Sequence, residues 1–331
     1  MTTLTRYDYT VGWLCALPKS ELVAAKQMLD YRHKPVRDLN EYDENTYTYG
    51  SINGHNIVIA CLPPGQPGGA SAARLVQPLS MSFPKMRVHL LVGVGGGVPR
   101  DPQPDNPDED VRLGDVVVGW AEQTGHPAVV QYDYVRHEKG GDGELLGRLD
   151  NPHWIVLNAL GALLANAYIE TKFEEHLRKV CQSLEGFSRP CEDDYLYHKT
   201  YSHVSGQTCS ACAPSSRVQR KARKSNHLIF HQGTILSGSS IMTDAETRDS
   251  LSKKYHDAKC FEMEAFGVMN QKHCLVIRGI SDYSDSHKNQ SWQKYAASTA
   301  AAFAREFLYT LQPHNASRME TMEDITSLER V

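Results

Sequence analysis

The sequence of 331 residues predicts an α/β fold with a mainly parallel central sheet. Short apolar runs rich in β-forming residues recur along the chain, for example at residues 9–17, 88–92 and 274–277. Between such runs lie segments whose apolar residues have helical spacing, as at residues 20–29. Strands that alternate with helices usually pair in parallel. The composition, 40% hydrophobic and 22% charged, is that of an ordinary globular protein.

Composition and charge argue against several classes of partner. A net charge of −4 gives no reason to expect a nucleic acid or a membrane as partner. No apolar run approaches the ~18 residues of a membrane helix, and the N-terminal residues lack the features of a signal peptide. Eight cysteines in so long a chain do not make a disulfide framework. We therefore expect a cytoplasmic protein.

The first strand–helix unit places one acidic residue near the end of a strand. Residues 9–17 predict a strand that stops at Pro18, a favoured first helical position. An amphipathic helix is expected to follow over residues 20–29. Glu21 lies in its first turn, where a carboxylate can complement the helix dipole or take part in catalysis.

A hairpin and a small-residue helix follow. Residues 47–52 and 55–62 flank an asparagine–glycine pair, which is the strongest short-range signal of a hairpin turn. Residues 70–82 predict a helix rich in small side chains, with Ser71 as its N-cap.

A glycine-rich segment, GVGGGVP at residues 93–99, follows the strand at residues 88–92. A glycine-rich turn there would let the backbone approach a ligand closely and offer its N–H groups to anions. The dinucleotide fingerprint requires Gly-x-Gly-x-x-Gly and then a helix. Here Val98 takes the place of the third glycine and Pro99 follows, so a nicotinamide-dependent enzyme is disfavoured. We expect no cofactor.

The remaining elements are less distinct. Residues 100–110 are rich in proline and acid and predict a solvated loop. Further strands are expected at residue 116 and over residues 129–135, and the stretch 231–242 predicts a strand, GTILSG, followed by a turn, SSIM. Helices are expected over residues 151–166, from there to 183, over 250–259, and from a Ser291 cap to about residue 311. Residues 313–331 are polar and predict a loose tail.

Residues 185–226 differ in composition from the rest and predict an insertion with few apolar runs. The insertion contains Cys209 and Cys212 in a CxxC arrangement. A lone CxxC is not a zinc site, because tetrahedral zinc needs two more ligands, and we predict no metal here. Candidates for the missing ligands are His198, His203 and Cys191.

The same insertion carries the octet RVQRKARK at residues 217–224, with five basic side chains. Such a run is usually a solvated loop. Alternatively, the octet reaches over a neighbouring pocket and holds a chain of phosphates.

The stretch of residues 260–285 carries the strongest functional signal. Glu262 and Glu264 stand at the head of a helix-like segment, and Asp282 follows an apolar run that ends in Arg278-Gly-Ile-Ser. Such a run predicts a buried strand with charged groups at its carboxyl end, where open α/β sheets place their chemistry. A single carboxylate there could be a satisfied core group. Three charged residues together, Glu264, Arg278 and Asp282, favour function.

Six segments follow, in order, the pattern of the nucleoside phosphorylase and nucleosidase superfamily: VGWLCAL, LLVGVGGGVP, VRLGDVVVG, GTILSG, FEMEA and VIRGISD. The sequence resembles in particular the methylthioadenosine/adenosylhomocysteine nucleosidases and fungal domains of this class with similar LPPG, VVQYDY and SDYSDSHKN segments. The resemblance covers residues 8–312 and is weakest at 185–226. It implies a single three-layer α/β/α domain and a homo-oligomer.

The resemblance also implies roles for individual residues. Asp282 would protonate the purine N7 as the glycosidic bond breaks, which requires a pKa raised by partial burial. Glu264 would accept hydrogen bonds from the ribose 2′- and 3′-hydroxyls and stabilise the oxocarbenium ion. Arg278 would position the nucleophile. Around the substrate we expect Met263 under the ribose, Ile241 and Met242 beside the base, and the backbone of Gly95, Gly96 and Gly97 near C1′.

The nucleophile is water or phosphate. Phosphorylases of this class hold phosphate with arginines, one of them in the first strand-to-helix loop, where this chain offers Glu21. A carboxylate ~4 Å from a phosphate would cost about 4 kcal/mol per charge pair, whereas it is a good general base for water. This favours hydrolysis. However, the nucleosidase pattern expects the glutamate at Ser20, so Glu21 keeps this role only if the turn absorbs one extra residue, because one helical position rotates a side chain by ~100°.

The group at the ribose 5′ position is the second open question. Thioether-specific nucleosidases line this position with apolar groups, but here His287, Lys288 and Asn289 follow the acid. These polar residues suit a 5′-hydroxyl or 5′-phosphates. We therefore predict a purine nucleosidase for an adenine-type nucleoside or nucleotide, with ATP as one candidate. The alternatives are a phosphate-dependent phosphorylase and a non-catalytic nucleoside sensor.

Overall fold

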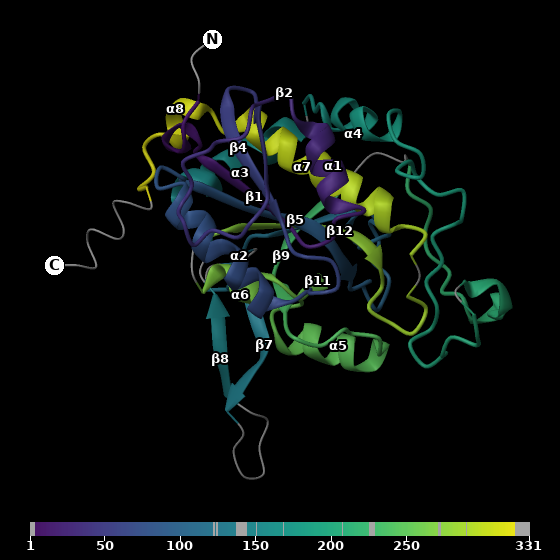
Figure 1. Ribbon diagram of the computed structural model, residues 1–331. Helices are drawn as coiled ribbons and strands as arrows, with labels where there is room; N and C mark the ends of the chain where they lie inside the picture. The colour runs from purple at the N-terminus through teal and green to yellow at the C-terminus, as the bar shows by residue number, and fades with distance from the viewer. Residues whose placement is uncertain are drawn as a thin grey trace.

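A computed structural model describes residues 4–121, 123, 125–136, 144–149, 151–167, 169–206, 208–224, 229–270, 273–288 and 290–321. Within these ranges twelve strands form one mixed sheet with helices on both faces, as Figure 1 shows. None of the helices in these ranges is long and apolar enough to cross a membrane.

The strands are β1 (Val11–Cys15), β2 (Tyr31–Arg32), β3 (Tyr47–Ile52), β4 (His55–Cys61), β5 (Val88–Gly97), β6 (Val116–Gly119), β7 (Val129–Arg136), β8 (Glu144–Leu149), β9 (Phe230–Gly233), β10 (Ile235–Ser237), β11 (Cys260–Glu262) and β12 (Leu275–Asp282). The α-helices are α1 (Glu21–Met28), α2 (Gly69–Ser82), α3 (Trp154–Ala167), α4 (Phe173–Cys181), α5 (Ala245–Lys254), α6 (Ala265–Met269), α7 (Gln293–Thr310) and α8 (Pro313–Ala316).

The sheet has the order β2-β3-β4-β1-β5-β11-β10-β7-β8, and β12 joins β5 to β6 and β9. Pairing is parallel for β1 with β4 and β5, for β5 with β12, for β10 with β7 and β11, and for β6 with β9. The hairpins β3–β4 and β7–β8 are antiparallel. This confirms the predicted α/β class with a mixed, mainly parallel sheet.

Strand β5 is central because it changes partners along one edge. Its first residues pair with β1 as far as Leu91, and Gly96 and Gly97 pair with β11. Its other edge pairs with β12. Residues 92–95 therefore lie between two partners, and the backbone groups of Val94 on this edge must be satisfied by side chains.

The two faces of the sheet have separate cores. On one face α1, α3 and α4 pack around α7, whose small and aromatic side chains are almost all buried. On the other face α2 and α6 pack together. Helix α7 can lie directly on β12 because Gly279 has no Cβ, which would be 1.9 Å from the Ala296 carbonyl oxygen.

Several predicted element boundaries are wrong. Residues 93–97 continue β5 instead of forming a turn, because β11 and β12 extend the ladder to them. Helix α1 begins three residues after Pro18, and Gly68 and Trp292 take the N-cap positions predicted for Ser71 and Ser291. The predicted strand GTILSG begins at the last residue of β9 and otherwise corresponds to β10, which has different neighbours, and α5 ends five residues earlier than predicted.

The C-terminal segment also differs from the prediction of a loose tail. Residues 313–316 form α8, and Ala316 and Met319 are buried against the core. Arg87 donates a hydrogen bond to the Met319 carbonyl oxygen. The rest of this segment lies outside the described residues.

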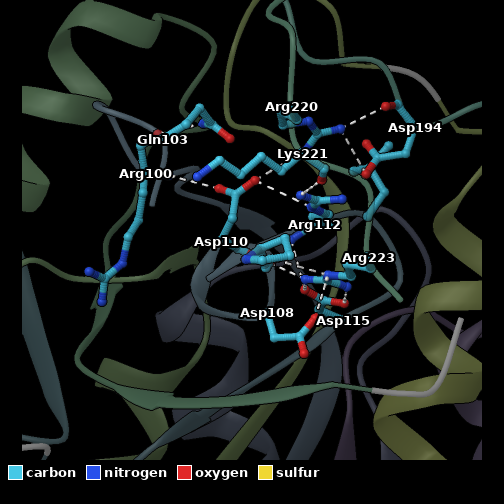
Figure 2. A network of polar contacts seen from close by, with 12 residues as sticks. Arg100, Gln103, Asp108, Asp110, Arg112, Asp115, Asp194, Arg220, Lys221 and Arg223 are labelled. Atoms are coloured by element: carbon cyan, nitrogen blue, oxygen red, sulfur yellow. Dashed lines mark hydrogen bonds and ion pairs between the residues drawn. The ribbon is translucent and has the colours of Figure 1, made fainter. Parts of the chain in front are cut away.

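The insertion is fastened to the body of the protein by ion pairs (Figure 2). Arg220 contacts Asp194 at 2.9 Å and the fully buried Asp110 at 3.6 Å, and Arg223 donates to both oxygens of Asp115 at 2.6 Å. The predicted solvated loop at residues 100–110 is therefore a docking partner of the basic octet. Buried side chains of the insertion, among them Phe187 and Leu196, also pack into the two cores.

Candidate active site

A cavity of about 400 Å³ opens at the carboxyl ends of β1, β5, β11 and β12. The partner change along β5 forms this cavity, because β1 ends before β11 begins. Five charged residues from five different elements line it: Glu21 from α1, Glu262 from the end of β11, Glu264 from the start of α6, Asp282 from the end of β12, and Lys288 from the following loop.

Arg278 lies fully buried beneath the cavity. Its guanidinium contacts the Glu262 carboxylate and donates to Glu264 Oε2 at 3.4 Å and to the Val94 carbonyl oxygen at 3.4 Å. Burial alone would lower the pKa of Arg278, but Glu262, Glu264 and Glu21 outweigh it and raise the pKa above its ordinary value. The site thus has one fixed positive charge below three carboxyl groups.

Glu21 is the first residue of α1, and its side chain is buried against the open edge of β5. Glu21 Oε2 accepts hydrogen bonds from the backbone N–H groups of Ala16 (2.6 Å) and Leu17 (3.0 Å), and Oε1 accepts one from Val94 (2.8 Å). Burial raises the pKa of Glu21, while Arg278 and the three backbone donors oppose this shift. Residues 18–20 form the turn that precedes α1, and with this turn Glu21 lines the cavity.

Glu262 and Glu264 have different environments. Glu262 accepts hydrogen bonds from the backbone N–H groups of Glu264 and Ala265 and from Arg278, so it ties β11 to α6. Glu264 Oε1 accepts one bond from the Gly68 N–H at 3.0 Å, and its carboxyl group lines the cavity. Burial raises the pKa of Glu264 to about 7, although Arg278 acts in the opposite direction.

Asp282 ends β12 and lies almost buried at the wall of the cavity. Its Oδ1 accepts from the Ser284 N–H at 3.0 Å, and its Oδ2 accepts from Ser281 Oγ at 2.8 Å. The ammonium group of Lys288 lies 3.1 Å from Oδ2, with the lysine side chain 46% exposed. A carboxylate has about four acceptor positions, so room remains on Asp282 for a ligand.

Gly96 allows Asp282 to take this position. A Cβ on Gly96 would lie 2.0 Å from Ser284 Oγ and 2.9 Å from Asp282 Oδ1. Besides the predicted approach of its backbone to the substrate, Gly96 therefore has a second reason to lack a side chain, which is its close packing against Asp282.

The other predicted residues separate into two groups. Ile241, Met242, Met263 and Lys288 line the cavity, together with the backbone at Gly95 and Gly96. Gly97 and His287 are not among its lining residues. Gly97 pairs with Cys260 in the sheet, and His287 lines a neighbouring cavity of about 380 Å³. Asn289 lies outside the described residues.

Sequence reasoning missed several lining residues. Ser281 and Ser284 donate hydrogen bonds to Asp282. Their positions next to the acid in RGISDYS could have indicated this. Gln290 and Gln293 reach the cavity from the end of the loop and the start of α7. No pattern in the sequence indicated that Pro67 and Phe261 also line it.

The basic octet does not supply a free cluster of cations to this cavity. Arg220 forms ion pairs with Asp194 and Asp110, and Arg223 forms one with Asp115. Lys221 pairs with an aspartate of the facing loop. The guanidinium carbon of Arg217 lies 3.4 Å from the centroid of the Tyr195 ring and faces the neighbouring cavity. Three of the five basic residues, Arg220, Lys221 and Arg223, are therefore paired with carboxylates of the protein itself, which argues against the alternative in which the octet holds a phosphate chain.

A mixed sheet with helices on both faces and a carboxylate-rich cavity at its strand ends defines an α/β domain of the nucleoside phosphorylase type. The sequence profile of the Phosphorylase superfamily matches residues 10–309, and this chain belongs to that family.

Two curated relatives extend the comparison. A nucleotide-binding leucine-rich repeat (NLR)-like protein of Hyaloscypha variabilis is 37% identical over 314 residues, which cover 94% of this chain and 30% of that protein. The ATP nucleosidase Cap17 of Escherichia coli is 33% identical over 87 residues, covering 24% of this chain and 17% of that protein. The chain thus spans less than a third of either relative.

Solved structures show the same fold. The 5′-methylthioadenosine/S-adenosylhomocysteine nucleosidase of Neisseria meningitidis, in complex with methylthio-immucillin-A, superposes with a TM-score of 0.56 at 16% identity, covering 91% of this chain and 98% of that one. The futalosine hydrolase of Helicobacter pylori gives a TM-score of 0.55 at 18% identity, with 91% and 97% covered.

Proposed function

We propose that the protein is a purine nucleosidase that hydrolyses the N-glycosidic bond of an adenine nucleotide. The observation that carries this proposal is the Glu21 carboxylate, held 2.8 Å from the Val94 N–H on the open edge of β5 and electrostatically coupled to Arg278. Glu21, Glu262 and Glu264 together place three carboxyl groups around one guanidinium. Such a site repels a phosphate dianion but accepts a water molecule.

In this mechanism Glu21 acts as the general base. Three of its roughly four acceptor positions are used by backbone N–H groups, which leaves one for a water molecule that attacks C1′. Burial raises its pKa and makes it a better proton acceptor. Glu264 accepts hydrogen bonds from the ribose hydroxyls, and its charge stabilises the oxocarbenium ion. Asp282, protonated in the reactive complex, donates its proton to purine N7.

Lys288 links the substrate to the acid. Its ammonium group contacts Asp282 Oδ2 at 3.1 Å, but nearly half of its side chain is exposed. A 5′-phosphate would attract this cation away from Asp282 and so free the carboxyl group for the base. The similarity to an ATP nucleosidase supports a nucleotide as substrate. We extend the proposal to a homo-oligomer that acts in the cytoplasm.

The choice of nucleophile is tested by measuring adenine release from ATP with and without inorganic phosphate. We expect equal rates and ribose triphosphate as the second product. Strict dependence on phosphate, with a product that carries a 1-phosphate in addition to the 5-triphosphate of the ribose, would establish the phosphorylase alternative. Tight nucleotide binding without any release of base would establish the sensor alternative.

The choice of substrate is tested by comparing ATP, AMP, adenosine and methylthioadenosine in the wild-type protein and in Lys288→Met. We expect the variant to lose severalfold in kcat/KM for ATP and to change little for adenosine. Equal losses for both substrates, or a wild-type preference for methylthioadenosine, would contradict the proposed role of Lys288. Gln293→Ala, a neighbouring change in the cavity without loss of charge, is the matched control.

A further inference from the structure

A second cluster of reactive side chains lies in the insertion, outside the nucleoside cavity. His203, Cys209 and Cys212 each offer one ligand atom, and these atoms lie within 4.8 Å of one another. His203 Nδ1 is 3.4 Å from Cys212 Sγ and 3.9 Å from Cys209 Sγ. The chain folds back between residues 203 and 212 to bring them together, and a short 3-10 turn at Cys209–Ala211 sets the two cysteines.

These separations suit a tetrahedral metal ion. Zinc–sulfur bonds of about 2.3 Å and zinc–nitrogen bonds of about 2.0 Å at a tetrahedral angle put sulfur and nitrogen about 3.6 Å apart. The two observed separations bracket this value. Two thiolates and one imidazole are ligands that select zinc over magnesium or calcium, which prefer oxygen.

His287, next to the cluster, is the candidate for a fourth ligand, although its ring nitrogens are not among the ligand atoms that lie within 4.8 Å of one another. The His287 ring is nearly buried, and neither of its nitrogens makes a hydrogen bond within the described part of the chain. Its centroid is 5.7 Å from that of His203, and the Cys209 thiol lies 4.0 Å from its carbonyl oxygen. Asp285 Oδ2 is 3.7 Å from His287 Nδ1, close enough to orient the ring. Burying an imidazole whose nitrogens make no hydrogen bond costs free energy, and binding a metal ion through one of these nitrogens would offset that cost.

A bound metal ion would also help to hold the insertion in one conformation. Among its described residues it forms only two short 3-10 turns and one isolated β-bridge, between Tyr197 and Arg217. A segment with so little secondary structure and few buried apolar side chains has little intrinsic stability. Structural zinc supplies folding free energy in such regions.

We propose that His203, Cys209 and Cys212 bind a structural Zn²⁺ ion, with His287 as the fourth ligand. Three ligands belong to the insertion and the fourth to the loop after Asp282. The ion therefore joins the insertion to the loop that carries Lys288, beside the hydrogen bond from the His203 N–H to Ser286 Oγ at 3.0 Å. The cysteines lose their protons on binding, and no redox step is involved.

The experiment measures the metal content of the full chain, purified without a histidine tag and without chelators, by mass spectrometry of the metal. We expect one zinc per chain. Cobalt replacing zinc should give the intense d–d bands of a tetrahedral site and thiolate charge-transfer absorption. A substoichiometric zinc content that does not rise after refolding with zinc would overturn the proposal. So would a Cys209–Cys212 disulfide in protein purified under reducing conditions.

Variants locate the ligands. Cys209→Ser, Cys212→Ser and His203→Ala should each lose the zinc, whereas His203→Cys should keep it, since a thiolate can replace the imidazole. Cys181→Ser, a cysteine in α4 remote from the cluster, is the matched control and should keep its zinc and its cobalt spectrum. Retention of zinc in the Cys209→Ser/Cys212→Ser double variant would refute the site.

The fourth ligand is tested separately. His287→Ala should weaken zinc retention against a chelator, and Cys191→Ser, which changes another thiol lining the same cavity, should not. The opposite result would overturn the assignment of His287. These metal measurements do not depend on catalysis, so they remain decisive even if the proposed nucleosidase activity is absent.

Discussion

The two halves of the candidate active site are built differently. The floor, with Glu21, Glu262, Glu264 and Arg278, rests on strands and on the first residues of helices, and its charges are buried and multiply bonded. The rim, with Lys288 and Ile241, rests on loops, and these side chains are 46% and 61% exposed. The floor can therefore fix the class of chemistry while the rim selects the substrate.

This difference predicts where substitutions act. A change in the floor should alter the chemical step or the stability of the fold, because each charge there depends on the others. A change in the rim should alter substrate preference and little else. Lys288→Met, described above, tests the rim, and the five experiments below test the buried residues of the site, beginning with the largest expected effect.

Asp282→Asn should reduce kcat by roughly 10²- to 10⁴-fold, the usual contribution of a general acid. The asparagine Oδ1 can still accept from the Ser284 N–H, and its Nδ2 can donate to Ser281 Oγ, so the melting temperature should stay close to that of the wild type. Asp285→Asn, a buried aspartate of the same loop that lines only the neighbouring cavity, is the control. If Asp282→Asn released adenine at the wild-type rate, Asp282 would not be the acid.

Arg278→Met should destabilise the protein by about 3–5 kcal/mol, because it leaves buried carboxylates without their cation. Urea denaturation followed by circular dichroism would measure the change. The comparison is Arg223→Met, whose partner Asp115 can still accept from His231 at 2.8 Å. That variant should cost about 1–3 kcal/mol, the value of hydrogen bonds to charged groups. If both variants lost the same free energy of unfolding, the charges of the floor would depend on one another no more than the ion pairs of the insertion do.

Gly96→Ala should displace the acid, because the new methyl group would overlap Ser284 Oγ. Overpacking of this kind typically costs about 1–3 kcal/mol, and here the loss should appear in kcat as well as in stability. The contrasting variant is Gly161→Ala in α3, where no atom lies within 4 Å of the added Cβ. It should stabilise the helix by about 0.5–1 kcal/mol. A wild-type kcat in Gly96→Ala would show that displacement of Asp282 does not affect the chemical step.

The pH profile should depend on Glu264. Its pKa is raised to about 7 by burial, so it is protonated below that pH and charged above it. Only the charged form accepts both ribose hydroxyls, so KM should fall roughly tenfold as pH rises through 7, an effect of about 1.4 kcal/mol. Glu264→Gln should have a high KM without this dependence.

The same raised pKa has a consequence for stability with a definite sign. Between the ordinary value of 4.5 and about 7, the folded protein holds a proton on Glu264 that the unfolded chain has lost. The contribution of Glu264 to the free energy of unfolding therefore decreases as pH rises through this window. Urea midpoints of wild type and Glu264→Gln across the window should diverge in that direction, and parallel curves would contradict it.

The sequence predicted the floor of the site better than the rim. An apolar strand ending in Arg278 and Asp282, and the EMEA segment beside it, have periodic and local signals that define both fold and position. Gly95 and Gly96 line the cavity but Gly97 does not, and the glycines continue β5 because two distant strands pair with them. The position of Glu21 could not be settled by counting, since it depends on how the turn at residues 18–20 closes.

The rim and insertion were harder because their geometry depends on long-range pairing. The basic octet and the acidic loop lie about a hundred residues apart in the chain, and only folding shows that Arg223 meets Asp115. Likewise, the sequence offered His203 as one of three candidate partners of Cys209 and Cys212, but nothing in it singled out His203 or indicated that His287 lies beside His203. Charge and cysteine patterns identify such residues as reactive but do not identify their partners.

The partner change along β5 makes one backbone amide a reporter of the active site. An amide inside a sheet normally exchanges its hydrogen with solvent only when the strands separate. The Val94 N–H is instead held by the Glu21 carboxylate. Its hydrogen exchange therefore follows the position and charge of a single side chain, and isotope labelling can record the proposed base without substrate or turnover.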